Sequence, residues 1–222
     1  MYPAKHFQTS AEERHKLCAL IADNPLATLV VNVDKPVPHI SHIPFHFSEC
    51  TFSTAIENKV LVAHVSNQHP LAEKLLTQKD VQVSLVFHGE QSYISPHCHD
   101  NTNANDNIGG QVVPTWNYAK VHVTGFANII QTPEQKYQQM LISSQYFERE
   151  QKQPWQLTEM SNKKVQQMLT AITFFKVSID TFEGHFKLSQ NKAQQVKRKI
   201  AEKLVVSGKA KLAAQIQENS LI

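Results

Sequence analysis

A succession of short β-strand patterns joined by tight turns limits the folds open to this chain. Residues 81–88 are rich in β-branched side chains, and the apolar run 26–33 ends in the turn Asp34-Lys35-Pro36. Strands linked in this way, with few helical crossovers, pair antiparallel in a barrel or a sandwich. The strands are predicted at residues 26–33, 38–47, 51–55, 60–65, 81–88, 91–95, 116–130 and 172–179, with a bend at Gly125. We interpret the pattern as one mainly β domain with helices (α+β), built as an antiparallel barrel.

Helical patterns lie near the ends of the chain and between the later strands. A capping box at residues 10–13 opens a helix that ends before Pro25, and Pro133 begins a second helix. Further helices are expected at 70–76, with Leu71, Leu75 and Leu76 facing inward, at 160–171 and beyond residue 192. We therefore expect a barrel domain with inserted helices over 1–182. A loop and a basic helical segment over 183–222 would pack on that barrel.

The composition excludes several classes of protein. None of the six glycines forms the GxGxxG or GxxxxGK[ST] spacing, so neither a Rossmann dinucleotide site nor a P-loop is supported. No apolar run approaches the roughly 20 residues that span a bilayer. The N-terminus lacks a signal-peptide core, and three cysteines without a CxxC pair suit a reducing compartment. We expect a cytoplasmic protein with no membrane association.

Basic residues are concentrated near the C-terminus. Residues 187–211 hold eight Lys or Arg and one acid, Glu202, although the net charge of the chain is only +3. Such a segment could contact a phosphate backbone, and more often it is a solvated helix face. No helix-turn-helix context accompanies Lys197-Arg198-Lys199, so nucleic acid is kept as a candidate partner only.

Residues 113–118 combine an aromatic plane with several hydrogen-bonding groups. Trp116 follows Pro114 and Thr115 and precedes Asn117 and Tyr118, at the start of an alternating strand pattern. A rigid turn of this kind can bind a flat polar ligand. It can equally be a capped strand with a half-buried Trp, and the residues alone do not decide between the two.

Other polar clusters offer groups that could bind an anion. In the strand pattern of residues 41–47, Ser41 shares a face with Ile43 and Phe45, while His42 and His46 share the other face. Residues 64–70 end a strand in small polar groups, and 183–192 combine two lysines with a Ser-Gln-Asn run. Each cluster also has an ordinary explanation, in solvated histidines, turn chemistry and a helix N-cap.

A metal site is not predicted. His42 and His46 would lie roughly 13 Å apart along a strand, too far to share one ion easily. Residues 97–100, His-Cys-His-Asp, are adjacent in the chain, and adjacent ligands rarely complete a tetrahedron.

Taken together, the ordered motifs resemble those of the PaiB-like family of FMN-binding negative transcriptional regulators. The resemblance implies an FMN-binding split β-barrel, Greek-key and antiparallel, related to the pyridoxamine-phosphate-oxidase-like flavoproteins. It also implies a homodimer, since those barrels usually pair with FMN at their interface. The motifs that carry the resemblance are Met1 to Phe7, Asn24 to Leu29, His42 to Phe45, His64 to Pro70, Ser92 to Pro96, Val113 to Val121 and Lys187 to Lys192.

The resemblance also implies an FMN site. Lys187 would hold the phosphate together with hydroxyl and backbone donors. Asn117 and Gln190 would bond the ring edge or the ribityl chain, and Trp116 would cover the ring. No catalytic residue is assigned. The predicted cofactor-binding residues are Ser41, His42, His64, Ser95, Trp116, Asn117, Lys187, Ser189 and Gln190.

Three stretches depart from the family pattern. Asn67 stands where the family carries an arginine near the phosphate, and Cys98-His99 replaces an aromatic pair. The family's Gly-Lys-Trp-Lys is Gly-His-Phe-Lys at 184–187. Loss of a bidentate cation weakens anion binding by about 1–3 kcal/mol unless another group replaces it.

Two functions on this fold stay open, with a third on different grounds. The first is an FMN-binding homodimer with a regulatory or sensing role. The alternative is a flavin-dependent oxidoreductase acting on a small molecule, for which His42, His64 or His97 could donate a proton. The third is a DNA-binding repressor that uses the basic C-terminal helices. Fold alone does not separate them, because function depends on the site.

Overall fold

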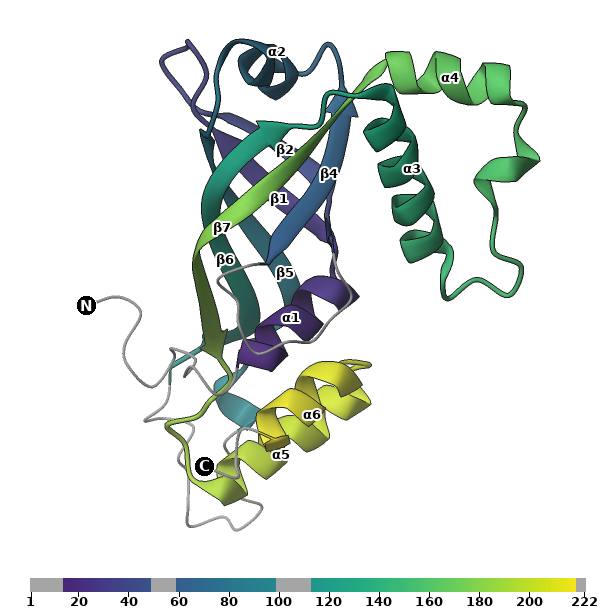
Figure 1. Ribbon diagram of the computed structural model, residues 1–222. Coiled ribbons are helices and arrows are strands. Elements are labelled where there is room, and N and C mark those ends of the chain that lie inside the picture. The colour runs from purple at the N-terminus through teal and green to yellow at the C-terminus, as the bar shows by residue number, and fades with distance from the viewer. Residues whose placement is uncertain (1–13, 49–58, 99–112, 219–222) are drawn as a thin grey trace, which may run out of the picture. The chain divides into compact units, whose positions relative to one another are not determined.

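The computed structural model describes residues 14–48, 59–98 and 113–218 of the 222-residue chain. The predicted capping box at 10–13, the predicted strand at 51–55 and residues 99–111 of the long loop lie outside these ranges. The strands are β1 (Leu26–Val31), β2 (His39–Pro44), β3 (His46–Phe47), β4 (Val60–Ser66), β5 (Val81–Ile94), β6 (Thr115–Ile129) and β7 (Ile172–Lys187). The helices are α1 (Arg14–Asp23), α2 (Pro70–Thr77), α3 (Pro133–Glu148), α4 (Asn162–Thr170), α5 (Gln194–Val206) and α6 (Ala210–Glu218), with short helical turns η4 (Pro96–Cys98) and η6 (Leu157–Glu159) (Figure 1).

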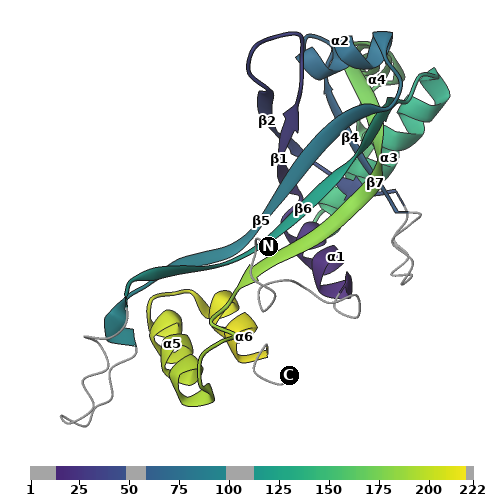
Figure 2. The ribbon, with the colours of Figure 1, turned by 90° about the vertical axis from the view of Figure 1, so that its left-hand side faces the viewer.

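The strands form one seven-stranded sheet in the order β2-β1-β5-β6-β7-β4-β3. β1 pairs antiparallel with β2 and β5, and β4 pairs antiparallel with β3 and β7. β5, β6 and β7 are neighbours in chain order, and β4, which precedes them, lies on the far side of β7 (Figures 1 and 2). This non-sequential neighbour is the Greek-key arrangement. It confirms the predicted mainly β, antiparallel split barrel.

The chain folds into two compact units. Unit 1 comprises residues 1–20, 88–121 and 183–222, and unit 2 comprises 21–87 and 122–182. Each unit is therefore assembled from separate stretches of sequence. The two domains predicted from the sequence, 1–182 and 183–222, stay a prediction.

The core of unit 2 follows the two-residue period of its strands. β1 buries every second side chain from Ala27 to Val31. Phe45 is fully buried and meets the edges of Phe87 and Phe175, with ring centroids 6.2 and 5.8 Å apart. Edge-to-face pairs of this kind add about 0.5–1.5 kcal/mol beyond the burial of their area.

The predicted strand 38–47 is interrupted, and the interruption changes which side chains are buried. β2 ends at Pro44 and β3 begins at His46, because the Phe45 amide donates a 2.9 Å bond to the Pro25 carbonyl. The prediction that His42 and His46 lie on the same face of one strand is therefore wrong. His42 is exposed, whereas His46 is 1% exposed.

Two predictions about strand boundaries and one about burial are corrected. The strands predicted at 81–88 and 91–95 are the single strand β5, and β7 continues to Lys187 through residues expected in a loop. Leu76, expected to face inward, is 72% exposed at the end of α2. Local patterns mark such ends poorly, because pairing with neighbouring strands sets how far a strand continues.

Gly125 allows close packing of β6 on β7, and the bend expected there stays a prediction. β6 is continuous through this residue. A Cβ atom at Gly125 would lie 2.3 Å from the carbonyl oxygen of Ser178 on β7. Only glycine allows the two backbones to approach so closely.

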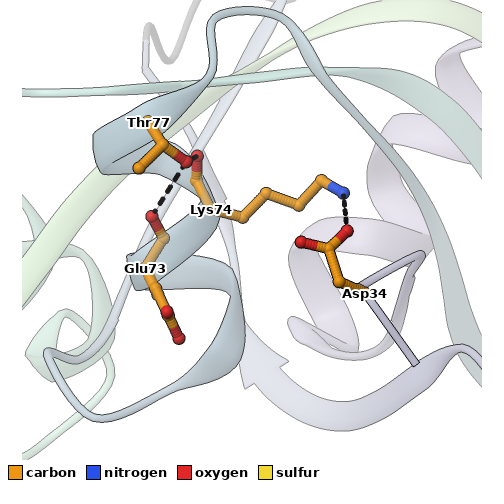
Figure 3. A network of polar contacts seen from close by, with 4 residues as sticks. All are labelled: Asp34, Glu73, Lys74 and Thr77. Atoms are coloured by element: carbon orange, nitrogen blue, oxygen red, sulfur yellow. Dashed lines mark hydrogen bonds and ion pairs between the residues drawn. The ribbon is translucent and has the colours of Figure 1, made fainter.

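Helix α2 is fixed at both ends by polar contacts. The His69 side chain caps its first turn. At the other end Thr77 Oγ1 donates to the carbonyls of Glu73 (3.4 Å) and Lys74 (3.1 Å), and Lys74 Nζ lies 4.0 Å from Asp34 (Figure 3). The Asp34 side chain is fully exposed, so this ion pair contributes little stability.

α3 and α4 form an insertion between β6 and β7 with its own apolar core. Thr132 caps α3 through a 3.2 Å bond from the Gln135 amide, and Pro133 occupies the predicted first position. Side chains from α3, η6, α4 and the start of β7 pack together: Leu157, Val165, Leu169 and Phe174 are buried, and Tyr137, Met140 and Leu141 pack against them.

In unit 1, α5 and α6 pack on each other and confirm the predicted helical C-terminal portion (Figure 1). Their contact buries Ile200 and Leu204 of α5 and Leu212 and Ile216 of α6. η4 lies against α5, where the Lys203 ammonium donates to the His97 carbonyl.

Candidate functional site

The last residue of β7 and the first residue of β6 form a polar pair in unit 1. Lys187 Nζ donates a 2.7 Å hydrogen bond to Thr115 Oγ1. A lysine ammonium has three N–H groups, and a hydroxyl that accepts keeps its own hydrogen for donation. The pair therefore offers further donors to an anion. The sequence pattern assigned Lys187 to the site and missed Thr115.

Asn117 and Ser189 form a second, buried pair in the same unit. Asn117 Nδ2 donates to Ser189 Oγ at 2.8 Å, and the two residues are 1% and 7% exposed. Asn117 lies two residues after Thr115 on β6, so the two side chains share a strand face. This places the Lys187 and Ser189 pairs next to each other.

Ser189 has an unusual backbone conformation. Its φ is +60°, in the left-handed region that costs a non-glycine residue about 1 kcal/mol or more. Gln190 holds the same loop. Its Oε1 accepts from the Leu188 amide at 2.7 Å, and its Nε2 donates to the Phe186 carbonyl. The loop after β7 is thus fixed by side chains before any ligand arrives.

Trp116 projects from the opposite face of β6. It is 54% exposed, whereas Thr115 and Asn117 on either side are more buried. Its ring meets the edge of Tyr93, also exposed, with centroids 6.2 Å apart. The structure therefore separates the indole from the Asn117 side chain, which the sequence grouped with it. Tyr93 was not among the predicted site residues, although it stands in the motif 92–96.

Ser95, the remaining predicted residue in unit 1, shapes the turn that follows β5. Its Oγ accepts from the His97 amide at 3.3 Å, and its carbonyl accepts from the Cys98 amide at 2.9 Å. These bonds form the start of η4.

In unit 2, a histidine network surrounds Ser41. His69 Nδ1 accepts from the Leu71 amide at 3.1 Å, so its Nε2–H donates to Ser41 Oγ at 3.1 Å. The His39 ring lies edge-on to His69 at 4.8 Å. Burial, and then the charge of His39, lower the pKa of His69. His69 is thus a neutral cap for α2, a role that sequence reasoning did not identify.

The other two predicted residues of unit 2 lie on different strands. His42 Nδ1 lies 3.3 Å from Thr28 Oγ1 on the paired strand β1. His64 on β4 packs against Phe174, with ring centroids 5.0 Å apart. Burial, and then the charge of His46, lower the pKa of His64, which favours a neutral imidazole.

Asn67, at the family's arginine position, is a structural clamp. Its Nδ2 donates to the Thr170 carbonyl at 2.7 Å, and its Oδ1 accepts from Thr173 Oγ1 at 2.8 Å. Its backbone amide donates to the Ala171 carbonyl at 3.0 Å. These bonds tie the end of β4 to the turn that leads into β7, all within unit 2.

The donor set of unit 1 fits a phosphate group. A cation, two hydroxyls and a rigid loop converge at the ends of β6 and β7, and a phosphate accepts hydrogen bonds from each of these donors. Within the described ranges, no three His, Cys, Asp or Glu side chains are grouped to hold a metal ion. No described helix is long and apolar enough to cross a membrane.

The chain is similar to known proteins over most of its length. Residues 1–181 match the protein-family model described as "Putative FMN-binding domain". The Protease synthase and sporulation protein PAI 2 of Bacillus subtilis is 26% identical over 224 residues, covering 100% of this chain and 98% of that protein.

Solved structures show the same fold at low sequence identity. The FAD- and heme-binding protein of Mycobacterium smegmatis has a TM-score of 0.53 at 17% identity, over 82% of this chain and 73% of that one. A flavocytochrome of Azotobacter vinelandii has a TM-score of 0.52 at 14% identity, over 83% and 75% of the two chains. These likenesses concern the fold alone. The match over residues 1–181, together with the split-barrel fold, shows that the chain belongs to the FMN-binding domain family, whose cofactor is FMN.

Proposed function

We propose that this chain is a cytoplasmic, homodimeric FMN-binding protein with a regulatory or sensing role, and that Lys187, Thr115 and Ser189 hold the flavin phosphate. The observation that carries the proposal is the pair of adjacent hydrogen bonds, Lys187 to Thr115 and Asn117 to Ser189. Each bond fixes a donor in place and leaves it able to donate again, which is the preorganisation that anion binding requires.

The predicted site residues fall into two groups, according to whether their side chains already hydrogen-bond to the loop after β7. Asn117 and Gln190 use their amide groups on Ser189, Leu188 and Phe186, so they act by fixing the loop. In unit 1, Ser95 and Trp116 remain for the ring and the ribityl chain. Ser41, His42 and His64 stay predicted site residues of unit 2.

Exposed apolar side chains at the sheet edge support the homodimer. In the β1–β2 register Leu26 stands opposite Pro44, and Val30 stands opposite Ile40. Leu26 is 58% and Ile40 is 61% exposed. Thr28 and His42 stand between these two pairs on the same face, so exposed apolar side chains alternate there with a polar pair. A partly apolar face on an edge hairpin is a surface that a second copy could cover in a symmetric dimer.

The regulatory role rests on similarity to the Bacillus sporulation protein rather than on a DNA-binding element. Much of the basic charge on α5 is engaged within unit 1. Arg198 pairs with Glu202 at 3.0 Å, Lys203 bonds the His97 carbonyl, and Lys197 is 7% exposed. Direct contact with a phosphate backbone therefore has less support than an indirect effect.

Comparing FMN with riboflavin tests the phosphate assignment. Riboflavin lacks the phosphate, so Lys187→Ala is expected to weaken FMN binding by about 10- to 100-fold and to leave riboflavin binding unchanged. Flavin fluorescence quenching measures both dissociation constants. Lys192→Ala, at an exposed residue five positions later, is the matched control. Equal FMN affinity of Lys187→Ala and the unmodified protein would remove the assignment.

Two further measurements address the rest of the proposal. Sedimentation of the FMN-loaded protein should give a dimer, and Ile40→Glu should shift it toward the monomer. A protein that is monomeric at all concentrations contradicts the dimer. Continued oxidation of NADH or NADPH in air by the flavin-loaded protein would favour the oxidoreductase alternative.

A further inference from the structure

A buried polar contact joins β3 to the second half of α3 within unit 2. His46 on β3 is 1% exposed, and its Nε2 lies 2.8 Å from Ser143 Oγ on α3. Its Nδ1 lies 2.9 Å from the Phe47 carbonyl. Because a carbonyl only accepts, Nδ1 carries the hydrogen in the neutral ring, and Nε2 accepts from the Ser143 hydroxyl. The hydrogen-bond pattern thus selects a neutral imidazole with one tautomer.

Aromatic side chains from α3 enclose the His46 ring. Tyr146 stacks on it at 5.2 Å with an interplanar angle of 29°, and Phe147 presents its edge at 6.0 Å. The Arg149 guanidinium lies 4.1 Å from the centroid of Tyr146. The environment on the α3 side is therefore two rings with a cation beyond them.

The charged groups around this ring do not favour a second positive charge. His64 on β4 interacts electrostatically with His46, and Lys59 Nζ lies 5.2 Å from the Phe47 ring centroid. The one acid on this part of α3, Glu148, directs Oε2 to the Trp155 amide at 3.0 Å. Burial lowers the pKa of His46, and its bond to the Phe47 carbonyl only partly opposes this effect. A proton on His46 is therefore accommodated better when water can reach the ring.

The two halves of α3 are held by different forces. Tyr137, Met140 and Leu141 in the first half pack into the apolar core of the insertion. The second half contacts His46 through Ser143, Tyr146 and Phe147, and the C-cap residue Arg149 donates to the Ala22 carbonyl. The first anchor contains no group that titrates near neutral pH, and the second depends on a neutral imidazole.

One unpaired acceptor lies at the junction between the halves. Gln139 Oε1 is buried and has no hydrogen-bond partner among the described residues. It stands one helical turn before Ser143, so the two side chains share a face of α3. When Nε2 of His46 gains a proton it becomes a donor, and Ser143 must accept. The displaced Ser143 hydrogen then needs a new acceptor in a buried site, such as the carbonyl or Oε1 of Gln139, and this rearrangement competes with opening of the contact.

We propose that protonation of His46 in mildly acidic solution releases the second half of α3 from β3, while the first half stays anchored in the core of the insertion. The insertion of α3, η6 and α4 is then a proton-sensitive element of the fold. The change is balanced: one proton is taken up, the hydrogen bond from the Ser143 hydroxyl to Nε2 breaks, and the charged ring becomes hydrated as the helix end opens.

Amide hydrogen exchange on the full chain tests this proposal, with the two halves of α3 as internal controls. Protection factors are measured between about pH 7.5 and about pH 5.5, around the ordinary pKa of histidine. Protection over residues 143–148 should fall with decreasing pH, by at most about tenfold per pH unit for one proton taken up. Protection over residues 137–141 should stay constant.

Variants assign the effect to one histidine. His46→Gln keeps a donor and an acceptor without a titrating group, so its protection over 143–148 should not depend on pH. His64→Gln should keep the pH dependence, and loss of the effect only in His64→Gln would overturn the assignment to His46. A pH-independent ratio between the two halves, or loss of protection in both halves together, would contradict the proposal.

A second measurement covers the case in which His46→Gln does not fold. The ring-proton NMR signal of His46 in the unmodified protein should titrate over the pH range in which residues 143–148 lose protection. Titration of His46 with that protection intact would overturn the proposal.

Discussion

Asn117 on β6 donates a 2.8 Å hydrogen bond to Ser189 Oγ, and this contact accounts for a backbone conformation that the sequence alone does not explain. Ser189 lies at φ +60°, where a non-glycine residue is strained. The buried amide of Asn117 needs an acceptor, and the hydrogen bond to Ser189 Oγ in this left-handed conformation offsets part of the strain. Lys187, which ends β7 directly before this loop, lies beside Thr115 at the start of the neighbouring strand β6.

A double-mutant cycle should measure this coupling. Asn117→Ala and Ser189→Ala are each expected to lower the free energy of unfolding by about 1–3 kcal/mol, since each leaves a buried polar group unpaired. The double variant should lose less than the sum, with a coupling energy of about 0.5–3 kcal/mol. Urea unfolding monitored by circular dichroism gives all four values. Strictly additive losses would show that the contact does not stabilise the loop.

Asn67 is expected to matter for stability and not for FMN. Its bonds to Thr170, Ala171 and Thr173 hold the turn before β7 in unit 2. Asn67→Ala should therefore lower the free energy of unfolding by about 1–3 kcal/mol. The FMN dissociation constant should stay within about twofold of the unmodified protein, well under 1 kcal/mol. Asn24→Ala, at another asparagine near a strand end, is a control for loss of an amide. If the Asn67→Ala protein is fully folded and still loses much of its FMN affinity, this position belongs to the FMN site.

Local patterns predicted the elements, and contacts distant in sequence determined the site. The strand periods, Pro133 at the start of α3 and the motif from Val113 to Val121 are encoded by neighbouring residues, so they could be recognised from sequence. Thr115 and Lys187 are 72 residues apart, and nothing in either local pattern indicates that they meet. The burial of His46 was missed for the same reason. The strand is interrupted just before His46, and this interruption depends on a hydrogen bond from the Phe45 amide to the distant Pro25 carbonyl.

Protonation of His69 should destabilise the fold in acid. Burial lowers the pKa of His69 in the folded protein below the 6.5 expected for the unfolded chain. Between these two values the unfolded state binds more protons, so stability is fully present above about pH 6.5 and falls as the pH drops below it. Protonation of Nδ1 also removes the acceptor for the Leu71 amide. His69→Asn keeps an N-cap acceptor without titrating, so its unfolding free energy should depend less steeply on pH.

Urea unfolding at a series of pH values measures this effect. His42→Asn, at an exposed histidine of the same unit, controls for loss of an imidazole and should keep the slope of the unmodified protein. His46 and His64 also have lowered pKa values, so His69→Asn should reduce the slope without abolishing it. An unchanged slope in His69→Asn would show that this histidine does not contribute.

Replacing Gly125 with alanine should lower the free energy of unfolding more than replacing Gly208, because only Gly125 lies against backbone atoms of another strand. A Cβ at Gly125 would lie 2.3 Å from the Ser178 carbonyl oxygen, and neither strand can move without breaking its pairing. Gly125→Ala should therefore cost about 2–4 kcal/mol of unfolding free energy. Gly208, after α5, has φ +77° and no atom within 4 Å of an added Cβ, so Gly208→Ala should cost only the backbone strain of about 1 kcal/mol. Thermal and urea unfolding of both variants give the comparison. If Gly208→Ala lowers the unfolding free energy as much as Gly125→Ala or more, then Gly125 does not serve the close approach of β6 and β7.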